Sequence, residues 1–368
     1  MNIAIDIVST KIGGGLDYIL NFLKTSDPTK HKFNKIFVFT NHSVKRLFPR
    51  KNFIKIIPLN NNDFFWFIRK NILISHYLEK KKINLFFIPS AINFIYKSKT
   101  VVMNQTLLPF RYDQIIRYFP NLFFFKLLFI RFFQEFSFRK SDGVIFLNKY
   151  GKQKVLSYTK TKDDVIIPLG IGDDKIKSLK NLKKNKNRQK KIKIIYISEV
   201  TYYKNHDLII KNLKESTLDF VIYFVGHIYK PYFNYLKKIN FSNDKFIFTG
   251  YLSSAETIKI LSKTDIFLFA SSVENYPVSI LEGIVSRKKI LSTSDQPVKK
   301  MLAKNAVFFS LDDKKDLEKK IIKVTKLNNK NNYIPSYIRV YNYNKIVEAT
   351  FKYFNKILKK NKNEYNWN

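Results

Sequence analysis

The chain has 368 residues, of which 45% are apolar, 67 are Lys or Arg, 28 are Asp or Glu and none is Cys. This length suits two domains of roughly 150 residues each, and the apolar fraction excludes a disordered chain. The lack of cysteine excludes disulfides, thiolate catalysis and Cys-ligated zinc. The formal net charge of +39 would attract anions such as acidic lipids, nucleic acid or phosphorylated substrates, although an AT-rich coding sequence produces the same excess of lysine without a selected role.

Two segments bear on membrane targeting. The first ten residues, MNIAIDIVST, alternate apolar and polar positions and lack a basic region, which predicts a strand and not a signal peptide. The most apolar stretch, residues 119–138, is interrupted by Lys126, Arg131, Gln134 and Glu135, whereas a membrane span needs about 20 nearly uninterrupted apolar residues. We therefore expect a cytoplasmic protein, with a peripheral contact at the cytoplasmic face of the inner membrane as a further candidate.

The first half of the chain alternates strand-like and helix-like segments. The predicted strands are residues 3–8, 36–40, 54–58, 85–89, 100–104 and 143–147. Helical spacing follows the glycine triplet at 13–15, and further helices are predicted over 64–80 and 113–140. This alternation predicts βαβ units and a parallel sheet.

A second alternating pattern follows a Lys- and Asn-rich stretch. Strands are predicted over 194–197, 220–225, 245–248, 266–270 and 289–292, and helices over 206–213, 229–239, 254–262, 277–286 and 343–360. The predicted fold class is therefore α/β, with two facing Rossmann-like domains and a ligand cleft between the carboxyl ends of their strands. The predicted parts are an N-terminal domain (1–175), a solvated linker (176–193), a C-terminal domain (194–342), and a basic helix and tail (343–368) that is a candidate to cross back to the N-terminal domain.

The segment IFLFASSVENYPVSILEGI, residues 266–284, is the strongest candidate for a functional site. A buried strand leads to a loop with Glu274, and Pro277 is expected at the first position of the following helix. The amides at that helix start suit a diphosphate. Glu282, further along the helix, could bind two adjacent ribose hydroxyls, and Glu274 could accept hydrogen bonds from a sugar.

Two glutamates eight residues apart also arise by chance, as a solvated loop residue and a surface helix residue. The Glu-Asn-Tyr-Pro turn between an apolar strand and a helix favours the functional interpretation. At this point the chain resembles family 4 of the glycosyltransferases, retaining enzymes with the two-domain GT-B fold that include group 1 enzymes of bacterial surface polysaccharide synthesis. Their E-x7-E signature matches Glu274 to Glu282.

Other matches extend the resemblance over most of the chain. They are the glycine-rich first loop (13–15), the segment NQTLLPF (104–110), the strand SDGVIFL (141–147), Tyr203-Lys204-Asn205, and FTGYL (248–252). The resemblance implies a retaining transfer of a sugar from a nucleoside diphosphate, in lipopolysaccharide O-antigen or capsule synthesis. The expected donor is a UDP- or GDP-sugar, and the expected acceptor is a saccharide or a polyprenyl-diphosphate-linked saccharide, with an anionic membrane surface as a further candidate contact.

The site residues follow from these matches. Lys204 would offset charge on the leaving diphosphate and Glu274 would orient the sugar, so these two are the catalytic candidates. The donor-binding candidates are Gly13, Gly14, Gly15, Gly226, Tyr251, Asn275, Tyr276, Pro277, Val278 and Glu282, and the acceptor-side candidates are Asn104 and Gln105. No cofactor is expected, and no metal, because no His, Asp and Glu cluster has ligand spacing.

Several alternatives stay open. Lys204 could be one more solvated lysine, and the glycine triplet, which does not match GxGxxG, could be a flexible loop. Family members often carry an Arg some residues before the lysine, where this chain has Glu199. A non-catalytic partner subunit is therefore an alternative, and a basic nucleic-acid-binding protein is a second one, without any recognisable module to support it. Residues 119–138 are expected to form a core helix, or alternatively a surface that meets a lipid-linked acceptor.

Overall fold

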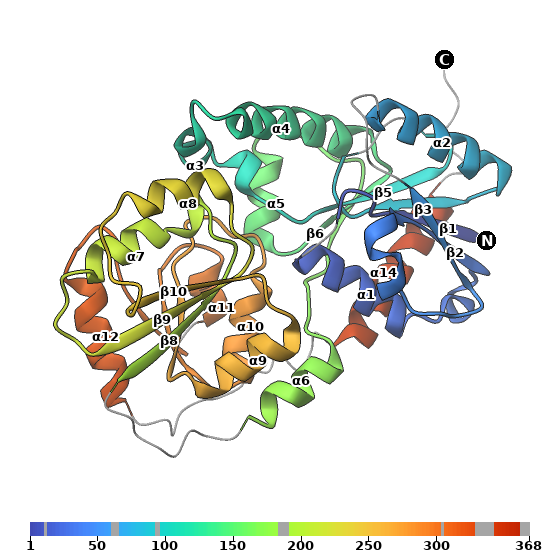
Figure 1. Ribbon diagram of the computed structural model, residues 1–368. Coiled ribbons are helices and arrows are strands. Elements are labelled where there is room, and N and C mark those ends of the chain that lie inside the picture. Colours follow the sequence, from blue (N-terminus) through green and yellow to red (C-terminus); the bar gives the residue numbers. More distant parts are fainter. Residues whose placement is uncertain are drawn as a thin grey trace. The chain divides into compact units, whose positions relative to one another are not determined.

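The computed structural model describes residues 1–10, 13–59, 66–92, 96–182, 191–302, 305–327 and 342–360. They form two compact units (Figure 1). The first comprises the described parts of Met1–Phe110, Phe125–Gly170 and Val340–Asn368, and the second those of Arg111–Phe124 and Ile171–Arg339. The chain therefore enters the second unit for a short segment, returns to the first, and enters the second again.

The first unit is built on a parallel sheet with the strand order β3-β2-β1-β4-β5-β6-β7. Its strands are β1 (Asn2–Asp6), β2 (Lys35–Asn41), β3 (Ile54–Leu59), β4 (Leu85–Ile88), β5 (Lys99–Asn104), β6 (Gly143–Phe146) and β7 (Asp164–Ile166). The central strands are buried apolar runs such as LFFI and GVIF, as expected where helices cover both faces of a parallel sheet.

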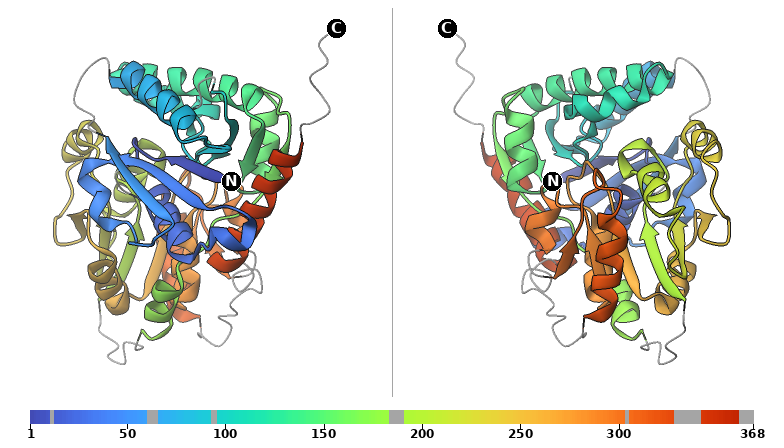
Figure 2. Two further views of the ribbon diagram at one scale, coloured as in Figure 1. Left: turned by 90° about the vertical axis from the view of Figure 1, so that its right-hand side faces the viewer. Right: turned by 90° about the vertical axis from the view of Figure 1, so that its left-hand side faces the viewer.

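Helices of the first unit cover this sheet. They are α1 (Gly14–Thr25), α2 (Trp66–Lys80), most of α4 (Leu122–Lys140), α5 (Lys149–Leu156) and α14 (Tyr343–Lys359), with the short 3-10 helices η1 (Pro28–His31), η2 (His42–Leu47) and η3 (Leu108–Phe110). The C-terminal helix α14, red in Figure 2, packs against α1, where Phe351 stacks on Phe22 at 5.6 Å between ring centroids. The Tyr353 hydroxyl also accepts a hydrogen bond from the Val144 amide at 3.1 Å. Helix α14, the last of the described elements, thus belongs to the core of the first unit.

The second unit holds a parallel sheet with the order β10-β9-β8-β11-β12-β13. The strands are β8 (Ile192–Ile197), β9 (Phe220–Val225), β10 (Phe246–Gly250), β11 (Ile266–Phe269), β12 (Lys289–Ser292) and β13 (Ala306–Phe308). Its helices are α3 (Tyr112–Ile115), η4 (Ile116–Tyr118), α6 (Asp173–Lys180), η5 (Tyr202–Lys204), α7 (His206–Leu213), α8 (Lys230–Lys237), α9 (Ser254–Lys263), α10 (Val278–Val285), α11 (Val298–Leu302) and α12 (Asp316–Lys326). The predicted α/β class, with parallel strands in both halves, is confirmed.

The single long helix predicted over 113–140 is wrong. The structure has α3 and η4, a break at Phe119-Pro120, and then α4. A proline has no amide to donate and disfavours helical backbone at the residue before it, so the helix cannot run through this point. The segment is also divided between the units, but the boundary lies after Phe124, within the first turn of α4. Residues 111–124 belong to the second unit and not to the N-terminal domain in which the sequence placed them.

The linker predicted over 176–193 is also partly wrong, since its start lies in helix α6. Asp173 and Asp174 lie in the first turn of α6 and Lys177 and Lys180 in the last, which suits the helix dipole. Leu179 is buried in the core of the second unit. Residues 183–190 of the predicted linker lie outside the described residues.

The sequence analysis missed α5, β7, α11, β13 and α12, which are short or strongly basic. Within the described ranges, every helix is too short or too polar to cross a lipid bilayer. Helix α4, the most apolar segment, has one buried face with Phe124, Leu127 and Phe138, and an exposed face with Phe125, Phe129 and Phe132. The buried face of α4 fits the expected core helix. The exposed face leaves room for the alternative, a surface that meets a lipid-linked acceptor.

Candidate functional site

The strand order of the second sheet reverses between β8 and β11. From β8 the chain moves to β9 on one side, and from β11 it moves to β12 on the other. The loops that follow the two strands therefore diverge at the carboxyl end of the sheet, the position at which ligands bind in open α/β sheets. Lys204 lies in the loop after β8, and Glu274 lies in the loop after β11. The two predicted catalytic residues thus meet at this switch point.

Lys204 and Glu274 form an ion pair in which the lysine Nζ donates to the carboxylate Oε1. Only 11% and 13% of the two side chains are exposed. The ammonium also lies 4.8 Å from the ring centroid of Tyr203. Burial would lower the pKa of Lys204, but the charge and hydrogen bond of Glu274 outweigh burial and hold this pKa above its usual value. Lys204 is therefore a fixed, permanently charged cation at neutral pH.

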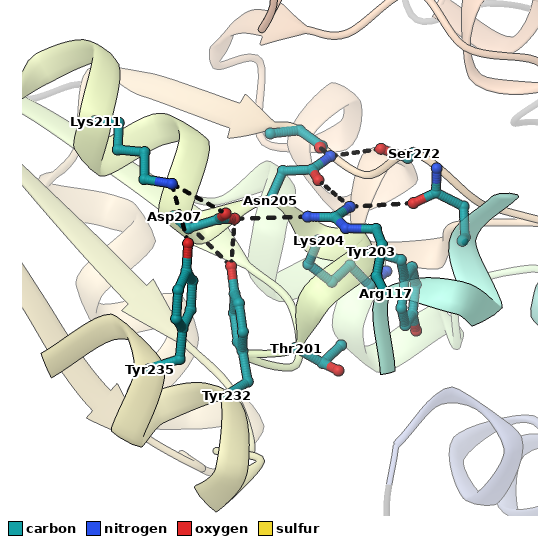
Figure 3. Close-up of polar contacts among 12 residues, drawn as sticks. Arg117, Thr201, Tyr203, Lys204, Asn205, Asp207, Lys211, Tyr232, Tyr235 and Ser272 are labelled. Carbon is teal, nitrogen blue, oxygen red and sulfur yellow. Dashed lines mark hydrogen bonds and ion pairs between the residues drawn. The ribbon is translucent and has the colours of Figure 1, made fainter. Parts of the chain in front are cut away.

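The loops that carry Lys204 and Glu274 are tied to each other through the backbone. The Ser272 amide donates to the Tyr203 carbonyl at 2.8 Å. Asn205, which is fully buried, donates from Nδ2 to the Ala270 carbonyl at 2.7 Å and to the Ser272 hydroxyl at 2.6 Å. Figure 3 shows the contact between Asn205 and Ser272, beside Tyr203 and Lys204. The position of the ion pair therefore depends on contacts between two loops more than 60 residues apart.

His206 begins helix α7 directly behind the Lys204 turn. It is fully buried and stacks on the Tyr196 ring at 5.1 Å between centroids. Burial, with a smaller contribution from the Lys204 charge, lowers the pKa of His206 to about 3. The imidazole is therefore neutral at pH 7 and a poor proton acceptor, which fits a packing role.

The segment after Glu274 leads into α10. Asn275 is buried, while Tyr276 and Val278 pack partly buried against the core of the second unit. Pro277 was expected as the first helical residue, but it is the N-cap, with ψ at 101°, and α10 begins at Val278. An extended ψ places a residue before the helix, so the first-turn amides begin one position later than expected.

Glu282 lies on the buried side of α10. Its Oε1 accepts a hydrogen bond from Lys175 Nζ at 2.5 Å. Lys175 comes from α6, which the sequence analysis assigned to the N-terminal domain and its linker, so this partner was missed. The predicted ribose-binding carboxylate is thus already paired with a cation.

Gly226 and Tyr251 follow β9 and β10 at the same edge of the sheet. A Cβ atom added at Gly226 would lie 2.1 Å from the Ser198 carbonyl oxygen, so close backbone packing requires glycine there. Tyr251 is exposed. Glu199, which stands where family members often have an arginine, lies 3.6 Å from His227 Nδ1 through its Oε1.

The remaining predicted residues lie in the first unit, at the carboxyl ends of β1 and β5. Gly13 precedes α1 with φ at 81°, a region that favours glycine. A Cβ added at Gly15 would lie 2.8 Å from Gln105 Oε1, so a predicted donor-side and a predicted acceptor-side residue lie together. Asn104 is buried and donates from Nδ2 to the Thr106 carbonyl at 3.0 Å.

The sequence analysis also missed Arg117, which donates to Asn205 Oδ1 at 2.7 Å. Arg117 is 88 residues from Asn205 along the chain and no local pattern marks it. In the part of the chain that the structure describes, no group of three His, Asp or Glu side chains is placed to hold a metal ion.

Residues 177–341 match the family model "Glycosyl transferases group 1". Among curated proteins, none matches the chain. Solved structures that resemble it include a glycosyltransferase from Rickettsia africae ESF-5, with 17% identity, a TM-score of 0.69 and coverage of 98% of this chain and 99% of that one.

Two other solved structures are similar. HepE from Anabaena, solved in complex with UDP and glucose, has 12% identity, a TM-score of 0.67 and coverage of 98% and 99%. WaaG, a glycosyltransferase involved in lipopolysaccharide biosynthesis, has 12% identity, a TM-score of 0.69 and coverage of 95% and 99%. The chain therefore has the GT-B fold, and its segment 177–341 is similar to the group 1 glycosyl transferases.

Proposed function

We propose that this protein is a retaining glycosyltransferase that moves a sugar from a UDP- or GDP-sugar to a saccharide or lipid-linked saccharide acceptor. The observation that carries the proposal is the buried Lys204–Glu274 pair at the switch point of the second sheet. The group 1 family match over 177–341 supports it, since that segment contains both residues. The UDP and glucose bound to the similar HepE structure agree with a nucleotide-sugar donor.

The donor diphosphate would bind at the start of α10 and beside Lys204. Helix N-termini direct amide groups at anions, and a lysine whose pKa is raised stays charged as the diphosphate leaves. Glu274 then has two tasks. It holds the ammonium in place before the donor arrives, and it accepts hydrogen bonds from hydroxyls of the transferred sugar once the diphosphate shares the lysine.

Retention of the anomeric configuration would follow from attack on the face that the diphosphate leaves. In this proposal an oxygen of the leaving phosphate takes the proton of the acceptor hydroxyl, so no side-chain base is needed. The neutral, buried His206 supports the proposal, because the histidine next to Lys204 is a poor base. The proposal assigns binding and charge stabilisation to the protein and proton transfer to the substrates.

We also propose that the acceptor is presented at an anionic membrane, as in lipopolysaccharide O-antigen or capsule synthesis. Phe125, Phe129 and Phe132 recur at helical spacing on the exposed face of α4, and 65% of Phe129 and 64% of Phe132 are exposed. Such a face is an expected partner for a bilayer interface, and the net charge of +39 would add attraction to acidic lipids. The similarity to WaaG, described as acting in lipopolysaccharide biosynthesis, agrees with this role.

The experiment that tests the function has two stages. Thermal shift and calorimetry with UDP, GDP, ADP and their sugars would identify the donor. Release of nucleoside diphosphate would then be followed with a membrane extract that supplies lipid-linked acceptors. Glu274→Gln should lower transfer far more than binding of the bare diphosphate, because the sugar contact is lost and the phosphate contacts remain.

The outcomes separate the alternatives. Donor binding without transfer for any sugar would favour the non-catalytic partner subunit. Absence of nucleotide binding, together with a salt-sensitive shift of DNA, would favour the nucleic-acid-binding alternative. Equal losses of transfer and diphosphate binding in Glu274→Gln would assign this residue to loop structure.

A further inference from the structure

A segment of 14 residues, 111–124, joins the second unit although residues on both sides of it belong to the first. Its aromatic side chains pack beside the Lys204 turn. The Tyr118 ring lies 4.9 Å from that of Tyr202 between centroids, and its hydroxyl is 2.8 Å from Thr201 Oγ1. The segment is therefore anchored next to the residues that carry Lys204.

Arg117 makes the polar contacts of this segment (Figure 3). Its Nη1 donates to Asn205 Oδ1 at 2.7 Å and to Gln114 Oε1 at 3.1 Å. Its Nη2 lies 3.7 Å from Asp207 Oδ1. The guanidinium thus spans the start of α7, from the residue that follows Lys204 to the first helical turn.

The contact with Asn205 fixes which way the buried amide points. A guanidinium can only donate, so it requires the amide oxygen. The Ala270 carbonyl can only accept, so it requires the amide nitrogen. Arg117 and Ala270 therefore select the same orientation from opposite sides, and only that orientation ties the Lys204 turn to the loop that leads to Glu274. Asn205 also has left-handed backbone at φ 59°, which such contacts must hold in a residue with a side chain.

Asp207 depends less on Arg117 than Asn205 does. The Tyr232 hydroxyl donates to Asp207 Oδ1 at 2.6 Å, and Lys211 Nζ is 4.0 Å from Oδ2. Among the described residues, no second donor reaches Asn205 Oδ1. Loss of Arg117 would therefore leave the buried carboxylate paired but leave the buried amide oxygen without a donor.

We propose that Arg117 is a positioning residue that acts through Asn205 to hold Lys204 against Glu274. Arg117 would bring a guanidinium to the Lys204 turn from a distant segment of the chain. Residue 199, where family members often carry an arginine, is a glutamate in this chain. Its catalytic consequence rests on the proposed function, but its structural consequence does not. The test therefore includes a readout that needs no substrate.

The variants are Arg117→Ala and Asn205→Asp, with Arg111→Ala as the matched control. Arg111 lies in the same segment, pairs with Asp113 at 2.8 Å, and has a side chain that is 21% exposed, against 25% for Arg117. Asn205→Asp keeps an acceptor for Arg117 but removes the donors to Ala270 and Ser272. Both variants should therefore weaken the link between the Lys204 turn and the loop that leads to Glu274, the first by removing the donor to Asn205 and the second by removing the donors of residue 205.

The measurement is amide hydrogen exchange followed by mass spectrometry. In both variants, peptides covering 201–206 and 270–275 should exchange about tenfold faster, while the β9 peptide, 220–225, and the Arg111→Ala protein stay unchanged. Arg117→Lys should recover only part of the protection, because one ammonium cannot span both acceptors. Uniformly faster exchange throughout the second unit, or no change in the two peptides, would overturn the proposal. If Arg117→Ala fails to fold, Arg117→Lys and Asn205→Asp decide between these results.

Activity provides the second readout. With the donor identified, Arg117→Ala should lower kcat about tenfold or more and leave diphosphate affinity within about threefold, since Lys204 is displaced but not removed. Equal losses in kcat and affinity would overturn the positioning role. If the wild-type protein transfers no sugar, the proposed function fails, and the exchange pattern still decides whether Arg117 controls the Lys204 turn.

Discussion

Lys175 donates from Nζ to Glu282 Oε1 at 2.5 Å, and so joins α6 to α10 in the second unit across 107 residues of sequence. Glu282 is buried, so its carboxylate requires a charged or hydrogen-bonded partner. A ribose bound at Glu282 would therefore share that carboxylate with Lys175. The pair would orient the glutamate before the nucleotide arrives, and the two residues can be separated by experiment.

Glu282→Ala should weaken nucleoside diphosphate binding by roughly ten- to a hundredfold, since a hydrogen bond to a charged group contributes about 1.5–3 kcal/mol. Lys175→Ala should lower the melting temperature but weaken binding by less, because the ribose contact remains. Calorimetry with the nucleotide and thermal denaturation without it would measure the two effects. Unchanged affinity in Glu282→Ala would show that this glutamate only holds α6.

A second prediction concerns pH and His206. The folded pKa is about 3 and the unfolded value about 6.5, so between these pH values the unfolded chain binds a proton that the folded chain does not. The unfolding free energy should therefore fall as pH drops below about 6.5. The loss from this one group is about 1.5 kcal/mol between pH 6.5 and pH 5.

Urea unfolding of the wild type and of His206→Phe at several pH values would measure this contribution. Phenylalanine suits the aromatic surroundings of Tyr196 and Phe224 and cannot bind the proton. His76→Gln, at an exposed histidine, is the control and should keep the wild-type pH dependence. Parallel curves for the wild type and His206→Phe would contradict the burial argument.

A third prediction concerns the exposed face of α4. Phe129→Ser combined with Phe132→Ser should reduce binding to phosphatidylglycerol vesicles by about a hundredfold or more, since each buried phenylalanine contributes roughly 1.5–3 kcal/mol. Leu327→Ser, at an exposed apolar residue of the second unit, should leave binding unchanged. Flotation at low and high salt would separate the apolar from the electrostatic contribution. Wild-type flotation by the double variant would contradict membrane contact through this face.

Much of the fold could be predicted because local patterns specify it. The runs IFLF and FVIYFV are buried strands where the sequence placed them, and His206–Leu213 forms the predicted helix. The order of the strands then explains why Lys204 and Glu274 meet, since loops at a switch point lie together. Periodicity predicted the elements, whereas the family resemblance singled out Lys204 and Glu274 and the structure supplied the strand order.

The partners of the site residues could not be predicted in the same way. Lys175 and Arg117 are two of 67 basic residues, and neither has a local pattern that sets it apart. Their roles depend on contacts 107 and 88 residues away in sequence. The break at Pro120 was readable, because proline disfavours a helix interior. The end of the segment that joins the second unit lies after Phe124, inside α4, where no local pattern marks it.

The last prediction concerns Lys204, which tests whether the protein is an enzyme. If this ammonium stabilises charge on the leaving diphosphate, its effect belongs mainly to the rate of transfer. Loss of one preorganised stabiliser typically lowers turnover about a hundred- to a thousandfold. Lys204→Ala should therefore keep sugar-nucleotide affinity within about tenfold and lose nearly all transfer.

Lys204→Ala also leaves Glu274 buried without its cation, which would disturb the loop that carries Glu274. This disturbance must be separated from the loss of the positive charge itself. The variant pair Lys204→Ala with Glu274→Gln removes both charges and should restore the melting temperature without restoring transfer. Lys204→Arg keeps the charge but replaces a compact ammonium with a planar fork, so it should recover only part of the activity. Nucleoside diphosphate release with a lipid-linked acceptor, measured beside thermal denaturation, would separate these effects. Full activity in Lys204→Ala would contradict the mechanism, because the mechanism assigns stabilisation of the leaving diphosphate to this ammonium.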